Sequence, residues 1–173
     1  MSTIGRWCVV LVGIATLAAC SSNPSGCAGA SLSGCDLSGA DLRGEMLDGQ
    51  NFSHANLEGA DLSDASLKGA DFSEAILENA KLENADLRGA TFSNARLNGV
   101  NLSGANLQDA DLNRTSLWRA DLSNSILINA NFAYASLHYA NLSGSNFEGA
   151  NFLAANLTGT ILEDTEVDPD RGK

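Results

Sequence analysis

Histidines, cysteines and carboxylates are the side chains in this chain that could do chemistry. The two histidines, His54 and His138, lie 84 residues apart, and neither shows an evident Ser or Cys partner for nucleophilic catalysis. The Asp residues recur at one position of a repeat, where capping of turns explains them without an acid–base pair. We therefore expect no catalytic residue, no metal site and no cofactor, and predict that the chain is not an enzyme. Calcium on stacked carboxylates, such as Asp41 and Asp61, is the weaker alternative.

The N-terminus has the pattern of an export signal. Arg6 supplies a positive charge ahead of an apolar run over residues 8–19. That run is shorter than the roughly 20 apolar residues needed to cross a bilayer. It ends in the tetrapeptide LAAC at residues 17–20, which resembles the lipobox of bacterial lipoproteins. An uncleaved anchor and an ordinary signal peptide are the alternatives.

The lipobox resemblance implies that residues 1–19 are a signal peptide, that Cys20 is lipidated, and that residues 20–29 form a flexible tether. Two or more acyl chains anchor a protein stably, where one chain does not. In lipoproteins an Asp after the lipidated Cys often signals retention at the inner membrane, and here that residue is Ser21. We therefore expect a lipid-anchored protein of the cell envelope. The outer membrane (periplasmic or surface face) is favoured if the cell is Gram-negative.

Two further cysteines, Cys27 and Cys35, would lie in a compartment that permits disulfides. A bond between them is one interpretation. The other is that Cys35 is a small buried hydrophobe, because it occupies a position that is mostly Ala elsewhere. Spacing alone does not decide between the two.

A five-residue repeat dominates the rest of the chain. Every fifth residue from Leu32 to Leu162 is Leu or Phe, at 27 positions without exception. Two residues earlier 19 of the 27 are Ala, one residue earlier 16 are Asp or Asn, and two residues later 20 are Gly, Asn or Asp. A period of five fits neither a helix nor a flat strand, so we expect a chain that turns a corner every five residues. The Leu and Ala then point inward, and Gly or Asn supplies a positive φ at the turn.

This unit resembles the repeat of the pentapeptide-repeat family, over residues 30–164. The resemblance implies an all-β fold, a right-handed quadrilateral β-helix with four repeats in each coil. Five of the six phenylalanines are separated by multiples of twenty, which independently supports a coil of 20 residues. We predict about seven coils, a rod about 32 Å tall with a filled interior, and an acidic tail over residues 165–173.

The net charge of −11 excludes a basic nucleic-acid surface, so we expect no nucleic-acid partner. Most of this charge lies in the half next to the tether, because residues 36–86 carry a net −9 and residues 87–162 are neutral. We predict a membrane-anchored, non-enzymatic interaction or scaffold module with an unknown protein partner. The alternative, implied by family members that mimic duplex DNA, is an acidic DNA mimic of the gyrase-interacting type. The lipobox and the neutral distal half favour the first interpretation.

Outward aromatic and basic residues gather in the neutral half. In a twenty-residue register Trp118 lies below His138, Arg119 below Tyr139, and Arg114 below Tyr134. Trp, Tyr and Arg are enriched at binding hot spots, so we predict that these six residues form a partner or dimer surface. The simpler interpretation is a set of exposed aromatics with a cation–π pair such as Arg119 with Tyr139. The family also pairs through its C-terminal coils, which implies a homodimer through that end.

Overall fold

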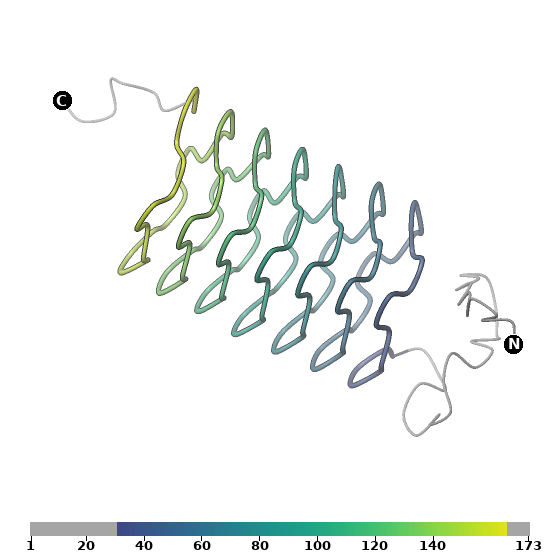
Figure 1. Ribbon diagram of the computed structural model, residues 1–173. Helices are drawn as coiled ribbons and strands as arrows, with labels where there is room; N and C mark the ends of the chain where they lie inside the picture. The colour runs from purple at the N-terminus through teal and green to yellow at the C-terminus, as the bar shows by residue number, and fades with distance from the viewer. Residues whose placement is uncertain (1–30, 166–173) are drawn as a thin grey trace, which may run out of the picture.

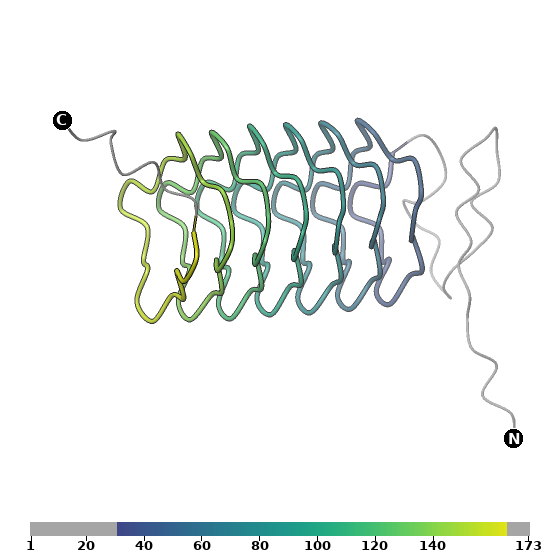
Figure 2. The same ribbon diagram turned by 90° about the horizontal axis from the view of Figure 1, so that it is seen from above.

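The structure, a computed structural model, describes residues 31–165, which wind into a rod of stacked coils (Figure 1). The colour runs steadily from purple to yellow along the rod, so coils that follow each other in sequence are neighbours in space, as the view from above also shows (Figure 2). Isolated parallel bridges join residues that are twenty apart, from Asp36 with Asn56 to Asn141 with Ile161. The coil is therefore twenty residues long, as the phenylalanine register predicts.

Residues 31–165 contain no helix, and their β-structure consists of single bridge residues without longer strands. The five-residue period explains this, because a turn interrupts the extended backbone before a strand can grow. The coils of the predicted all-β fold are thus joined by ladders of isolated parallel bridges. Its right hand and its count of about seven coils stay predictions.

A tight turn follows each inward Leu or Phe. In one example the amide of Val100 donates to the carbonyl of Leu97 at 3.2 Å, and Gly99 between them has a φ of 66°. The residue at the equivalent position of every repeat has a φ between 53° and 72°. This left-handed region favours Gly, Asn and Asp, which accounts for their frequency there.

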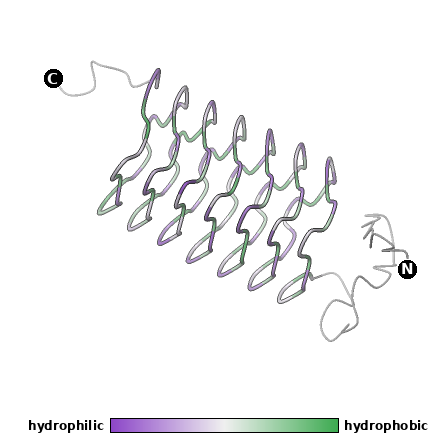
Figure 3. Cartoon of the chain, viewed as in Figure 1, coloured by the Kyte–Doolittle hydropathy of each residue, from purple (hydrophilic) through white to green (hydrophobic). Residues whose placement is uncertain are grey.

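The inward side chains form a continuous core along the rod. Phe52, Phe72 and Phe92 stack with ring centroids 4.8 and 4.9 Å apart, and Leu112 ends this run. The Ala two positions before an inward residue, such as Ala70 before Phe72, is buried as well. A typical repeat thus fills the core with one large and one small residue, and hydrophobic segments of successive coils lie in register (Figure 3).

Hydroxyl side chains replace Ala at three buried positions. Thr115, Ser125 and Ser145 each donate their hydroxyl to the carbonyl three residues earlier, at 2.6–2.7 Å. A buried polar group is costly unless it is hydrogen-bonded, and across residues 31–165 each buried side-chain nitrogen or oxygen has a partner. The interior therefore tolerates these hydroxyls without a loss of order.

The Asp or Asn before each inward residue caps the turn, as predicted. Asn101 accepts a hydrogen bond from the amide of Ser103 at 3.0 Å, and Asp121 accepts one from that of Ser123 at 2.9 Å. In repeats with a coil on each side, this amide is the one that does not donate to a backbone carbonyl. The side-chain carbonyl or carboxylate thus satisfies a backbone donor, which is a structural role.

The C-terminal end of the described rod is incompletely covered. Leu157 and Leu162 are 40% and 47% exposed, whereas Leu142, one coil before Leu162, is fully buried. Phe147 and Phe152 meet edge to face with ring centroids 5.7 Å apart. The last described coil therefore presents apolar side chains on its outer side.

Candidate interaction surface

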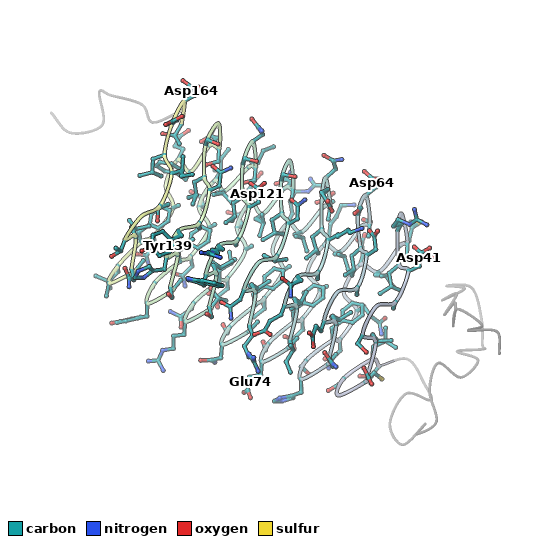
Figure 4. The ribbon with its side chains drawn as sticks, viewed as in Figure 1. Asp41, Asp64, Glu74, Asp121, Tyr139 and Asp164 are labelled. Carbon is teal, nitrogen blue, oxygen red and sulfur yellow. The ribbon has the colours of Figure 1, made fainter. Side chains whose placement is uncertain are left out.

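The six predicted surface residues lie toward the C-terminal end of the rod. We call them the distal surface; its members are Arg114, Trp118, Arg119, Tyr134, His138 and Tyr139. Trp118 is 44% exposed, Tyr134 55% and Tyr139 54%. In Figure 4 the label of Tyr139 lies among the C-terminal coils, far from Asp41 at the other end. The distal surface is thus exposed to solvent in the described part of the rod.

The large side chains of the distal surface form two columns. One consists of Arg114 and Tyr134, and the wider one consists of Trp118, Arg119, His138 and Tyr139. The amide of Arg119 donates to the carbonyl of His138 at 3.0 Å, because residues one coil apart stack. In this register Tyr134 lies above Arg114, and Tyr139 lies above Arg119. The predicted stacking of the surface residues is therefore present.

Small side chains separate the two columns. Ser116 and Ser136 form a parallel bridge between the two coils, midway between the columns. The rod therefore presents, on this side, a low strip with a ridge of aromatic and basic side chains along each edge.

Each arginine of the distal surface stacks on an aromatic ring. The guanidinium carbon of Arg119 lies 4.4 Å from the centroid of Trp118, and that of Arg114 lies 5.7 Å from the centroid of Tyr134. Both distances are within the range of a cation–π contact. The predicted pairing of Arg119 with Tyr139 is wrong, because the neighbouring indole on the same turn is the ring that Arg119 covers.

Four members of the distal surface occupy the left-handed turn position. Arg114, Arg119, Tyr134 and Tyr139 have φ angles of 58°, 54°, 60° and 57°. A side chain there costs about 1–2 kcal/mol relative to Gly. These four positions lie at neighbouring corners of two successive coils, and their large side chains project outward from the rod.

Among residues 31–165, the two arginines are the basic residues that lack an acidic partner. Within the described part of the chain, every other Lys or Arg makes an ion pair with Asp or Glu, at 2.6–3.6 Å, whereas Arg114 and Arg119 make none. Stacking on an aromatic face leaves the guanidinium N–H groups at the edge free to bind a carboxylate or phosphate.

Sequence reasoning missed the residue that holds the backbone of Trp118. The Oδ1 atom of Asn98 accepts hydrogen bonds from the amide of Trp118 at 3.2 Å and from the hydroxyl of Ser116 at 2.6 Å. Lys68 is held the same way, since Asp48 accepts from its amide and from the hydroxyl one residue before the inward Leu. A Ser before the inward residue, with Asn or Asp eighteen residues earlier, is the signal that could have revealed it.

Tyr139 is fixed from above by a glycine. A Cβ atom on Gly159 would lie 2.5 Å from the Tyr139 ring, so the ring rests directly on that backbone. The His138 ring lies 5.0 Å from the same ring, and its Nδ1 is 3.0 Å from the side-chain amide nitrogen of Asn156. Contacts within the rod therefore hold these two rings in place.

In the half of the rod that follows the N-terminal segment (the proximal half, residues 36–86), several carboxylates accept hydrogen bonds from neighbouring side chains. Asp41 accepts two hydrogen bonds from the Arg43 guanidinium, at 2.7 and 2.8 Å, and these lower the pKa of Asp41 to about 2. A hydrogen bond from a serine hydroxyl similarly lowers the pKa of Asp48, and the bonds from Arg88 lower the pKa of Asp86. The acidic charge of this half is thus partly neutralised within the rod.

The predicted cysteine sites fall mainly outside the described residues. Cys20 and Cys27 both lie there. Cys35 is 1% exposed, and its sulfur is in a disulfide bond. The pairing of Cys35 with Cys27 stays a prediction.

Residues 31–165 hold no helix with the length and hydropathy to cross a membrane. The same residues contain no group of three His, Cys, Asp or Glu side chains arranged to hold a metal ion.

Three solved structures are similar to this chain. A pentapeptide repeat protein from the Arabidopsis thaliana thylakoid lumen is 39% identical, with a TM-score of 0.56, over 57% of this chain and 69% of that one. HetL, involved in heterocyst differentiation regulation in the cyanobacterium Nostoc, is 36% identical over 79% and 82% of the two chains, with a TM-score of 0.40. QnrB1, a plasmid-mediated fluoroquinolone resistance protein, is 26% identical over 79% of each chain, with a TM-score of 0.41.

No curated protein matches the chain significantly. The model of the pentapeptide repeats family matches in 8 copies, over residues 30–69, 65–104, 105–138 and 125–164. These matches cover the whole repeat region, whose turns, bridges and inward ladders are described above. The chain belongs to the pentapeptide-repeat family.

Proposed function

We propose that this protein is a lipid-anchored, non-enzymatic interaction module that captures a protein partner through the distal surface. One observation carries the proposal: two arginines without acidic partners stack on exposed Trp118 and Tyr134, on a rod whose interior is filled. Residues of these types dominate the energetics of protein interfaces. The rod itself is proposed to be a right-handed, four-sided β-helix of about seven coils.

The anchor is proposed to be the lipidated Cys20, at the outer membrane if the cell is Gram-negative. The support is the LAAC tetrapeptide behind a short apolar run, with Ser21 after the cysteine. Mass spectrometry of the mature protein from membranes should find an acylated Cys20 as the first residue. A chain that retains Met1 and fractionates with the cytosol would contradict the anchor but not the partner surface.

Partner capture can be tested with a double substitution in the full chain. Trp118→Ser with Tyr139→Ser removes two of the exposed rings of the distal surface, whereas Ser123→Ala with Ser143→Ala changes an adjacent side of the same coils. Both variants should keep the circular dichroism spectrum of the wild type. We expect that only the first loses the partner in cross-linking from native membranes, and equal capture by both would contradict the proposal.

The DNA-mimic alternative is less well supported by the surface. Basic side chains interrupt the acidic columns of the proximal half: Lys68 follows Asp48 with a nitrogen–oxygen distance of 3.6 Å, and Lys81 follows Asp61 at 3.5 Å. A mimic of duplex DNA needs regularly spaced charges that remain free.

A further inference from the structure

One side of the rod changes its charge from end to end. We call it the 114–119 side; it comprises residues 114–119 and the stacked equivalents of these residues in the other coils. Its proximal coils carry four carboxylates, those of Asp36, Glu58, Glu74 and Glu78, and no Lys or Arg. From residue 94 to the end of the described rod the same side carries no carboxylate, and both unpaired arginines lie on it.

We propose that two copies of this chain pair through the 114–119 side, with their rods antiparallel. The inference rests on the proposed function, because it names a second copy of the chain as the occupant of the distal surface. A two-fold symmetric contact requires a surface that is complementary to itself. The 114–119 side meets this requirement, since its basic aromatic end would face the acidic end of its partner.

The register of the pair follows from the column positions. We place the two-fold axis in the interface, perpendicular to both rods, at the level of residues 94–99. Each column of one rod then faces the same column of the other rod, with the coils in reverse order. Arg114 then faces Glu74 of the partner subunit, and His138 faces Glu58 of the partner subunit. Trp118, which carries the guanidinium of the next residue on its ring, faces Glu78 of the partner subunit.

The backbone and exposure of the facing residues suit these contacts. Glu74 and Arg114 both occupy left-handed turn positions, with φ angles of 59° and 58°, so both side chains project from the same kind of corner. The Glu74 side chain is 58% exposed and lies 3.3 Å from the ring of His54. It can therefore reach a guanidinium across the interface without a backbone change.

Shape is complementary in the same register. Tyr139 faces Gly59 of the partner subunit, and no atom lies within 4 Å of the Cβ position of Gly59. The large ring thus meets a position with open space. An aromatic ring that fills such a position buries a large apolar area, and Tyr is enriched at binding hot spots.

The centre of the contact is free of repulsion. Arg96 would lie close to its own copy on the axis, but it is neutralised by Glu78 of the same rod at 2.6 Å. Asn98 beside it is uncharged and is hydrogen-bonded to Glu78 at 3.2 Å. The two-fold axis therefore brings together no unpaired like charges.

Charge reversal tests both the contact and its register. The full chain is purified in one detergent, and the mass of the complex is measured by sedimentation as a function of concentration. Arg114→Glu should weaken the dimer at least tenfold, because the introduced carboxylate would face Glu74 of the partner subunit. Glu74→Arg in the same chain should restore it, since each reversed residue then faces the other. Arg43→Glu, the same charge change on another side of the rod, should leave the dimer intact.

Each alternative result has a definite meaning. A wild-type chain that is monomeric at all concentrations overturns the inference, and loss of a host partner on Trp118→Ser would then still support the proposed function. A dimer that survives Arg114→Glu but dissociates on Leu157→Asp pairs through the C-terminal coils instead, and this also overturns the inference. Failure of Glu74→Arg to rescue a folded Arg114→Glu chain overturns the antiparallel register.

Discussion

Arg119 lays its guanidinium over the indole of Trp118 at 4.4 Å, although Tyr139 lies one coil directly above it. The indole is the strongest cation–π acceptor among the aromatic side chains. Trp118 is itself fixed through its amide by Asn98, so the platform under the guanidinium is held by the rod. The stacked pair is therefore preorganised, which lowers the entropy lost when a partner binds.

The substitution Arg119→Lys measures how much this stacking contributes to the affinity for the partner. Lys retains the charge but not the planar group that covers the ring, and it does not bind a carboxylate through two parallel hydrogen bonds. We expect the affinity for the partner to fall by about 0.5–1 kcal/mol, with no change in melting temperature. Sedimentation or titration of wild type against Arg119→Lys measures this, and equal affinities would show that only the charge matters.

Two glycines of the same column provide a matched pair of substitutions. Gly59 and Gly159 have φ angles of 64° and 72°, so an Ala at either should cost about 1–2 kcal/mol in stability. Only at Gly159 would the new Cβ meet the ring of Tyr139. Thermal unfolding should therefore show a larger loss of stability for Gly159→Ala than for Gly59→Ala, because only Gly159→Ala displaces the Tyr139 ring. Identical losses would contradict the contact between the ring and the backbone.

The inward assignment is tested in the middle of the rod. Leu122 is fully buried, and its neighbour Ser123 points outward between coils without an acidic residue directly above or below it. Leu122→Asp should cost more than about 3 kcal/mol, because it puts a carboxylate into an apolar core. Ser123→Asp should cost less than about 0.5 kcal/mol. Chemical denaturation of the two variants, compared with wild type, measures both values.

The sequence predicts the rod more completely than its surface. A coil of twenty residues follows from the phenylalanine spacing, and the turn angles follow from Gly and Asn, because both depend on a strict repeat. The ring on which Arg119 stacks cannot be predicted from the repeat, because the flexible side chain can reach both Trp118 and Tyr139. Asn98 escapes prediction for a related reason, because its bonds reach to the next coil and are absent from the five-residue pattern.

Asn98 shows the consequence for substitutions. From the repeat alone it is an outward residue that tolerates change. In the structure it accepts from the amide of Trp118 and donates to Glu78. We expect Asn98→Ala to cost about 0.5–1.5 kcal/mol, because it removes the hydrogen bond that the exposed Trp118 amide donates. Near-ultraviolet circular dichroism should also change as the indole loosens; an unchanged signal and melting temperature would contradict this role.

Acid should abolish the stability that Asp41 contributes to its turn. The bonds from Arg43 lower the pKa of Asp41 from 3.8 to about 2 in the folded chain, whereas in the unfolded chain the carboxyl titrates near 4. Between these values the unfolded state binds more protons, so the contribution of Asp41 to stability is complete above about pH 4 and is lost as the pH falls through about 2. The melting temperature of wild type should therefore exceed that of Asp41→Asn by a constant amount above about pH 4, and the difference should shrink as the pH falls through about 2 and vanish at about pH 1. Arg43→Ala removes the cause of the shift and should give a similar profile. A difference that persists undiminished at about pH 1 would mean that the carboxylate charge is not what stabilises this turn.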